Sequence, residues 1–348
     1  MNETKIIVKP SGGIEYPVVV GRSLLDTVAQ YIPKGVAKIA VITQQEIPYE
    51  LKFDGYESQV FIAPSGETAK KLSTVETLLE EISSFGLSRR DLIVCMGGGV
   101  VTDLGGFVAS VYFRGIRYIN VATTLLAQVD AAIGGKTGVN LAHGKNLAGT
   151  FWQPSAVLCD IDTLETLPER ELRCGYGEMA KYDFLGVGEL SGLDLVTDVS
   201  HCATIKARIV SMDVRENGQR ALLNYGHTLA HALEGLALEG KIDYLYHGEA
   251  VAIGLVYAAH LAHLLGRIDQ FELDYHYQVL DKFALSSSLP RDATFVSLLP
   301  YLYRDKKAYG SLTFVLGSSE RGLEVVDGIL EGQVNGALDK MRDHQRRF

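Results

Sequence analysis

The sequence predicts an α/β domain built on a parallel β-sheet, followed by a mainly α-helical domain. Short β-rich runs alternate with helical segments through the first half of the chain, as in βαβ units. From about residue 165 helical segments dominate, and β-branched runs become rare until 311–317. The chain has 348 residues, more than the roughly 250–300 at which single cores stop growing. We therefore predict two domains, 1–166 and 167–348.

The predicted elements of the first domain follow one another closely. Residues 5–9 and 15–21 are β-rich runs separated by Ser11-Gly12-Gly13, which predicts a hairpin. Between Glu67 and Phe85, apolar residues recur at helical spacing. The other predicted elements are a short helix at 24–32, strands at 38–43, 59–64, 91–96 and 117–122, and a helix after the glycines at 97–99.

The second domain is predicted to consist mainly of helices. Its helical segments are longer than the β-rich runs of the first domain, and the next β-rich run comes late, at 311–317. The predicted helices are 165–185, 199–214, 221–236 and 249–266.

Charge and cysteine usage limit the possible partners and compartments. The net charge of −9 argues against nucleic acid or a membrane surface, because both require a basic face. The N-terminal segment has no apolar signal core, and no apolar run reaches the ~20 residues of a membrane span. The four cysteines form no CxxC pair, so buried reduced thiols are expected. A cytoplasmic protein is expected.

Three consecutive glycines, Gly97 to Gly99, follow a predicted strand and precede a predicted helix. Such a turn lets backbone N–H groups approach a phosphate at the positive end of the helix. It is not the dinucleotide fingerprint GxGxxG, because Thr102 stands where the third glycine would fall, and Asn120 stands where the following strand would end on an acidic residue. The alternative is a tight turn without a ligand.

Glu178 and Lys181 lie three residues apart in a predicted helix and therefore share one face. A surface ion pair is the simple interpretation, and such a pair would carry little meaning. Gly175, Gly177 and Ala180 surround the two charges, and small residues allow a ligand to approach closely.

The strongest local cluster lies in the segment 216–234. Arg220, Asn224, His227 and His231 fall at helical spacing, which predicts that they share one face of a helix. His247 begins a further apolar helix. Imidazole is the commonest ligand for zinc-like metals, and Glu178 with two histidines would make a three-ligand site with open positions, as in catalytic metal centres. Spacing alone does not identify the two histidines. Lys306 and Lys307 precede the late strand, where an exposed charge pair is the simple alternative.

In chain order, these segments resemble the 3-dehydroquinate synthase family of sugar-phosphate cyclases. The resemblance runs over roughly residues 40–317 and rests on an ordered set of motifs. The motifs are GGGVVTDLGGFVA, RG at 114–115, TTLLAQVDAAIGGKTGVN, GKN, TLETLP, GEMAKY, LNYGHTLAHALE, HGEAVAIG and DKK.

The resemblance implies a Rossmann-like N-terminal domain, a helical C-terminal domain, a homodimer, bound NAD and a divalent metal ion, zinc or cobalt. It assigns the metal ligands to Glu178, His227 and His247, and leaves His231 for the substrate phosphate. The implied NAD contacts are Glu67, Lys70, Gly98, Gly99, Val100, Asp103, Thr123, Thr124, Asp130, Lys136, Lys145, Thr163 and Thr166. The implied substrate contacts are Lys136, Asn146, Lys181, Lys206, Arg220, Asn224, His231 and Lys306, with Arg114 reaching the phosphate of the neighbouring subunit.

The implied reaction converts 3-deoxy-arabino-heptulosonate 7-phosphate to 3-dehydroquinate and phosphate, a step of aromatic amino-acid biosynthesis. It proceeds by transient oxidation, phosphate elimination, reduction, ring opening and aldol closure, and Lys206 and Arg220 are expected at the substrate carboxylate. One departure from the family is Thr43-Gln44-Gln45, which lacks the acidic or Asn residue often found there for the adenosine ribose.

Three other functions compete with this one. A sister cyclase forming 2-deoxy-scyllo-inosose or a valiolone would act on a substrate without a carboxylate, whereas this chain keeps the expected carboxylate contacts Lys206 and Arg220. A metal-dependent polyol dehydrogenase would need no phosphate-binding cluster and would release NADH. An inactive dimeric paralogue would bind NAD and metal without turnover, although every expected ligand is present.

Overall fold

The structure is a computed structural model that describes residues 3–142, 144–186, 190–216, 218–303 and 311–346. The chain divides into two compact units. The first unit comprises Met1–Pro168 and Asp194–Arg215, and the second comprises Glu169–Leu193 and Glu216–Phe348. Lys306 and Lys307 lie outside the described residues.

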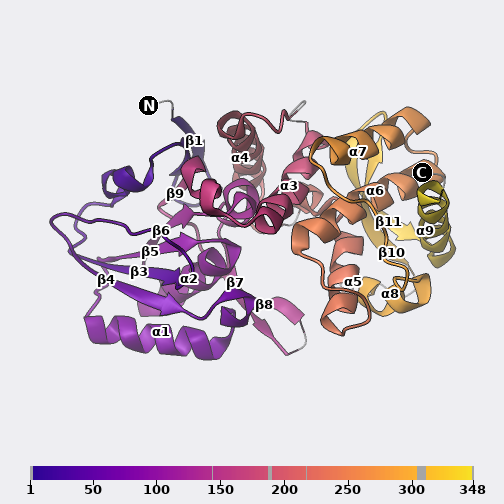
Figure 1. The fold of residues 1–348 in the computed structure, drawn as a ribbon. Helices are drawn as coiled ribbons and strands as arrows, with labels where there is room; N and C mark the ends of the chain where they lie inside the picture. The colour runs from indigo at the N-terminus through magenta and orange to yellow at the C-terminus, as the bar shows by residue number, and fades with distance from the viewer. Residues whose placement is uncertain (1–2, 143, 187–189, 217, 304–310, 347–348) are drawn as a thin grey trace. The chain divides into compact units, whose positions relative to one another are not determined.

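A seven-stranded sheet forms the centre of the first unit (Figure 1). From β2 to β4 all neighbouring strands are parallel, and β1 pairs antiparallel with β2. The predicted parallel sheet and the predicted N-terminal hairpin are therefore confirmed. In spatial order the strands are β1 (Thr4–Val8), β2 (Tyr16–Gly21), β9 (Ala156–Asp160), β6 (Arg117–Ala122), β5 (Leu92–Gly97), β3 (Lys38–Gln44) and β4 (Glu57–Ala63).

Alternate side chains of the central strands enter two separate cores. In β5, Ile93 and Cys95 pack with helices α1 (Leu72–Phe85) and α2 (Gly99–Val111) on one face. Leu92, Val94 and Met96 point to the other core, which includes residues of β2, β6 and β9. Burial on both faces explains why the strands read as continuous apolar runs in the sequence. Short 3₁₀ helices lie at Leu25–Tyr31, Gly66–Ala69, Tyr112–Arg114 and Ile161–Thr166, and a π-helical turn lies at Ala127–Ala131.

A second hairpin, β7 (Lys136–Leu141) and β8 (Gly144–Phe151), was not predicted. Its strands are rich in glycine and polar residues, which weakens the β signal in the sequence. The glycines are required by the packing of the two strands, because a Cβ on Gly149 would lie 2.1 Å from the carbonyl oxygen of Thr137.

Helix α4 (Leu195–Met212) belongs to the first unit, although it follows the predicted boundary at residue 166. It contacts β1, β2 and the turn Ala127–Ala131. The compact units therefore do not follow a single boundary. Sequence periodicity marks α4 as a helix but carries no information about the sheet on which it packs.

The second unit is mainly helical, as predicted. Helix α6 (His247–Leu264) is buried along most of its length and contacts α3, α5, α7 and α9. A small antiparallel pair, β10 (Leu312–Ser318) and β11 (Gly322–Ile329), packs on this helical unit through β10 and α6. The other helices are α3 (Glu169–Asp183), α5 (His227–Leu238), α7 (Gln270–Lys282), α8 (Phe295–Leu302) and α9 (Glu331–Gln345).

The predicted helix over 221–236 is wrong in one respect, because the segment is two helices. A 3₁₀ helix spans Gln219–Asn224, the chain turns at Gly226 (φ 79°), and α5 begins at His227. A Cβ on Gly226 would lie 2.9 Å from the backbone nitrogen of Leu255 in α6, so close packing against α6 accompanies the break. Arg220 and Asn224 therefore do not share a continuous helical face with the two histidines.

Over the residues that the structure describes, none of the helices is long and apolar enough to span a membrane.

Candidate active site

Three side chains distant in sequence converge within the second unit. Glu178 comes from α3, and His227 and His247 are the first residues of α5 and α6. Oε1 of Glu178 lies 3.0 Å from Nε2 of His227 and 2.9 Å from Nε2 of His247. The donor atoms all lie within 4.8 Å of one another, an arrangement that could hold a metal ion.

Glycines next to each of these three residues bring the helices together. A Cβ on Gly177, beside Glu178, would lie 2.1 Å from the carbonyl oxygen of Gly248. A Cβ on Gly248, beside His247, would lie 1.8 Å from the carbonyl oxygen of Cys174. A Cβ on Gly254 would lie 2.0 Å from the carbonyl oxygen of Gly226, which precedes His227. Backbones therefore touch where larger residues would hold the helices apart, and the three side chains can meet.

The far nitrogen of each imidazole has its own acceptor. Nδ1 of His227 lies 3.1 Å from the carbonyl oxygen of Tyr225, and Nδ1 of His247 lies 3.4 Å from Oε2 of Glu234. These acceptors favour a proton on Nδ1, so each Nε2 would be free to give its lone pair to a cation beside Glu178, in place of its present contact with Oε1. Two lone pairs and a carboxylate facing one point are the donor set of a divalent cation such as zinc, so the residues fit the predicted metal.

The start of α6 is held by an ion pair between Arg170 and Glu249. The backbone N–H of Tyr246, the residue before α6, donates to Oε2 of Glu249 at 2.8 Å. Arg170 binds both carboxylate oxygens of Glu249, with Nε and Nη2 each at 2.8 Å. These contacts hold the residue before His247, so they help to position that imidazole.

The charges at the cluster shift one another's protonation. Burial would raise the pKa of Glu178, but the ammonium of Lys181 and the two imidazoles hold it well below its usual range. Burial lowers the pKa of His227. Burial also opposes protonation of His247, but the hydrogen bonds to Glu178 and Glu234 raise its pKa to about 10. The causes therefore differ: neighbouring positive groups lower the pKa of Glu178, burial lowers that of His227, and two carboxylates raise that of His247.

The other predicted residues of the second unit lie at different distances from this cluster. His231 is exposed, and its ring centroid lies 5.5 Å from that of His227 and 6.2 Å from that of His247. Asn224 donates from Nδ2 to Oε1 of Glu216 at 2.7 Å, and Arg220 is buried in the 3₁₀ helix. Of these three residues, His231 is the one whose ring lies beside the rings of His227 and His247.

In the first unit, Gly98 to Val100 and the pair Thr123 and Thr124 directly follow β5 and β6, at the carboxyl ends of strands where open α/β sheets bind ligands. Gly98 precedes α2, and Gly99 and Val100 form its first turn. The N–H of Thr123 donates to the carbonyl oxygen of Gly97 at 3.1 Å. A Cβ on Gly98 would lie 2.9 Å from Cγ2 of Thr124, which explains the glycine. The predicted succession of strand, glycine turn and helix is confirmed.

A polar network surrounds Lys70. Its Nζ lies 2.7 Å from Oδ2 of Asp103 and also donates to Oδ1 of Asn146. Asn140 connects the same group, because its Nδ2 donates to Oε1 of Glu67 at 2.6 Å and its Oδ1 accepts the N–H of Asn146 at 2.8 Å. Burial raises the pKa of Asp103, and the charge of Lys70 opposes this shift. Sequence reasoning missed Asn140, although it lies within the motif TTLLAQVDAAIGGKTGVN.

Asp130 and Lys206 form an ion pair within the first unit, with Nζ 2.6 Å from Oδ1. The family resemblance assigns Asp130 to NAD and Lys206 to the substrate carboxylate. Lys206 comes from α4, whose place in this unit the sequence did not reveal. The pairing of the two side chains was not predicted.

The remaining predicted residues lie at the surface or in the 3₁₀ helix Ile161–Thr166 that follows β9. Lys136, Lys145 and Arg114 are exposed, and Arg114 has a φ of 66°. The hydroxyls of Thr166 and Tyr49 lie 2.7 Å apart, and Thr163 donates to the carbonyl oxygen of Asp160 at 2.6 Å.

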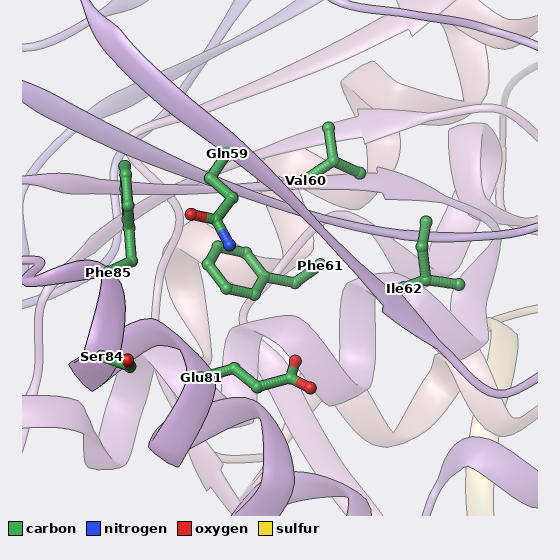
Figure 2. A pocket seen from close by; sticks show the side chains of 7 residues that line it. All are labelled: Gln59, Val60, Phe61, Ile62, Glu81, Ser84 and Phe85. Atoms are coloured by element: carbon green, nitrogen blue, oxygen red, sulfur yellow. The ribbon is translucent and has the colours of Figure 1, made fainter.

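A surface pocket of about 470 Å³ lies between β4 and α1 (Figure 2). None of the predicted site residues lines it. The lining residues are Gln59, Val60, Phe61, Ile62, Glu81, Ser84 and Phe85. The candidate site therefore rests on the side-chain clusters above and not on this pocket.

Comparisons with known proteins identify the family. The sequence-family model for the 3-dehydroquinate synthase N-terminal domain matches residues 60–174 of this chain. The family model for the C-terminal domain matches residues 175–308. A protein of Amycolatopsis mediterranei with the provisional name aminodehydroquinate synthase is 45% identical over 94% of this chain and 92% of its own. The 3-dehydroquinate synthase of Desulforamulus reducens is 37% identical over 94% of this chain and 98% of its own.

A solved structure agrees with this result. The 2-deoxy-scyllo-inosose synthase complexed with carbaglucose-6-phosphate, NAD⁺ and Co²⁺ has a TM-score of 0.83 and 26% identity, over 97% of this chain and 99% of that one. Its fold confirms the predicted fold class. The chain therefore belongs to the 3-dehydroquinate synthase family of enzymes.

Proposed function

We propose that this protein binds NAD and a divalent metal ion and converts 3-deoxy-arabino-heptulosonate 7-phosphate to 3-dehydroquinate and phosphate. The observation that carries the proposal is the convergence of Glu178, His227 and His247, with both Nε2 atoms within 3.0 Å of one carboxylate oxygen. A relative with 37% identity that carries the name of this activity supports the same reaction.

In this proposal Glu178, His227 and His247 hold the metal ion, and Zn²⁺ or Co²⁺ suits the donor set. When bound, the metal would supply Lewis-acid activation of a substrate hydroxyl, and NAD would supply a reversible hydride acceptor. The proposed NAD contacts are the residues of the first unit that the resemblance implies. They are the turn Gly98–Val100 with Thr123 and Thr124, and the Lys70 network with Glu67 and Asp103. The others are Asp130, Lys136, Lys145, Thr163 and Thr166.

The proposed substrate contacts are cationic and amide side chains, which suit a phosphate and a carboxylate. His231 is exposed beside the metal cluster, and Lys181 pairs with Glu178 directly. Holding both anionic ends of the substrate would favour the reactive geometry. The proposed set is Lys136, Asn146, Lys181, Lys206, Arg220, Asn224, His231 and Lys306, together with Arg114 from the partner of a homodimer.

Incubation with the heptulosonate phosphate, NAD and Zn²⁺ tests the reaction. We expect release of phosphate with formation of 3-dehydroquinate, and loss of both after chelation. Glu178→Gln should abolish turnover and 1:1 binding of Co²⁺. Glu169→Gln is the matched control, because Glu169 lies on the same helix with 83% of its side chain exposed. Full turnover by Glu178→Gln would refute the proposed metal site.

A second candidate is the amino analogue of this reaction. It is favoured by the relative of Amycolatopsis mediterranei, which is 45% identical to this chain and is provisionally named for an amino product. The two candidates share the phosphate, the carboxylate and the ring closure, so the proposed metal and anion contacts serve both. The ratio of kcat/KM for the heptulosonate phosphate and its amino-substituted analogue separates them. Turnover of glucose 6-phosphate, which has no carboxylate, would instead favour a sister cyclase.

A further inference from the structure

Tyr225 joins the predicted metal ligand His227 to a histidine of α7. Its carbonyl oxygen lies 3.1 Å from Nδ1 of His227, and its hydroxyl lies 2.7 Å from Nε2 of His276. Tyr225 is fully buried, so both polar ends of the residue depend on partners within the protein. The backbone and the side chain of Tyr225 therefore link two imidazoles.

The direction of each hydrogen bond follows from the partners. Nδ1 of His276 lies 2.7 Å from the carbonyl oxygen of Glu272, which can only accept, so this nitrogen carries a proton. Burial lowers the pKa of His276 to about 4, so the imidazole is neutral near pH 7 and its Nε2 accepts the hydroxyl proton of Tyr225. At the other end, the carbonyl oxygen of Tyr225 accepts from Nδ1 of His227. Nε2 of His227 is thereby directed at the metal cluster.

His276 has little freedom to move. Its ring stacks on Phe184, with the centroids 4.0 Å apart and the planes 7° from parallel. Phe184 directly follows α3, the helix that carries Glu178. Gly226, the residue between Tyr225 and His227, has a positive φ of 79° and packs its backbone against α6. A further support of the Tyr225 carbonyl is the Tyr225 side chain, which His276 holds by a hydrogen bond.

We infer that His276 is a positioning residue for the metal ligand His227, acting through Tyr225. The inference rests on the proposed metal site. Without the imidazole acceptor, the Tyr225 hydroxyl would be buried with no partner, and the side chain would have to move to find one. That movement would displace the carbonyl that orients His227 and would weaken metal binding. The effect would arise on α7, a helix that contributes none of the three ligands.

Titration of the metal-free full-length protein with Co²⁺, followed by visible absorption, tests the inference. His276→Phe should weaken Co²⁺ binding about tenfold, the low end of the roughly 10–100-fold loss when outer partners of metal ligands are changed. The Co²⁺ spectrum should also change, because the geometry at His227 changes. His276→Gln keeps an acceptor and should recover much of the affinity. Tyr225→Phe removes only the hydroxyl and should recover affinity when combined with His276→Phe, because no buried polar group is then left without a partner.

His260→Phe is the matched control. Nε2 of His260 lies 2.8 Å from the hydroxyl of Tyr277, and burial lowers the pKa of His260 to about 4 as well. This pair repeats the chemistry of His276 and Tyr225 on helices α6 and α7 without a contact to a ligand, so His260→Phe should leave Co²⁺ affinity unchanged. Equal Co²⁺ affinities of His276→Phe and His260→Phe would overturn the inference about His276 but would leave the proposed metal site standing. Absence of Co²⁺ binding by the wild-type protein would overturn the metal site and the inference together.

Discussion

Lys181 and Glu178 form a buried ion pair one helical turn apart on α3, with Nζ 2.6 Å from Oε2. Only 1% and 2% of the two side chains are exposed. The other carboxylate oxygen, Oε1, is the one that faces His227 and His247. The ammonium thus keeps Glu178 ionised inside the protein and leaves one oxygen for the proposed metal ion. The simple interpretation of these residues as a solvated surface pair is wrong.

Lys181→Met should destabilise the metal-free protein by roughly 3–5 kcal/mol, because it leaves the Glu178 carboxylate buried without its cation. A bound metal ion would replace part of the lost charge, so the loss should be smaller with Zn²⁺ present. Urea unfolding of the wild type and of Lys181→Met, each with and without Zn²⁺, measures the two losses. Lys241→Met, which removes an exposed lysine paired with Glu239, is the control. An equal loss with and without Zn²⁺ would contradict a metal at Glu178.

Gly248→Ala should weaken both stability and metal binding. The new Cβ would overlap the carbonyl oxygen of Cys174, so α3 and α6 would have to separate and carry Glu178 away from His247. We expect a loss of about 1–3 kcal/mol, as for other overpacked sites, together with weaker Co²⁺ binding. Gly332→Ala has open space around the new Cβ and should change neither quantity. Unchanged Co²⁺ affinity in Gly248→Ala would show that this helix crossing does not position the ligands.

Stability should fall as pH decreases from about 6.5 towards 4, because His260 and His276 are buried. Their pKa values in the folded protein are lowered to about 4, against 6.5 for an ordinary imidazole. Below pH 6.5 the unfolded chain binds protons that the folded protein does not, so the unfolded state gains stability until the pH reaches the folded pKa. Each unit of difference is worth about 1.4 kcal/mol.

Comparison of wild type with His260→Phe measures this dependence. The free energy of unfolding of the variant should vary less than that of the wild type between pH 6.5 and 4.5, because the variant lacks the His260 imidazole. Parallel pH profiles for the two proteins would show that His260 does not resist protonation in the folded state.

Arg114→Ala and Glu178→Gln should each be inactive alone and should recover activity when mixed, if Arg114 completes the site of a partner subunit. Arg114 is exposed at the end of the short helix Tyr112–Arg114, so it is available to a second copy. In a mixed dimer one of the two sites would contain both intact residues, and up to about half of the wild-type activity per dimer is expected. Phosphate release after co-expression is the measurement. Failure to recover would place Arg114 in the site of its own chain or outside any site.

The sequence determined the local elements and the identity of the chemical groups. The run Leu92–Met96 is apolar on both faces, which indicates a strand buried on both sides, and the glycines after it indicate a tight turn or a close approach. The segment 221–236 shows where periodicity fails. Its apolar residues keep helical spacing, yet Gly226 interrupts the helix because α6 packs directly against its backbone.

Tertiary structure decided which groups meet. The three proposed ligands come from three helices and meet because glycines bring those helices into backbone contact, and no local pattern records which helices touch. The same holds for α4, which packs on β1 and β2 and brings Lys206 to Asp130. The physical reason is that spacing along a chain reports only the face of an element, whereas the partner of that face depends on packing between elements far apart in sequence.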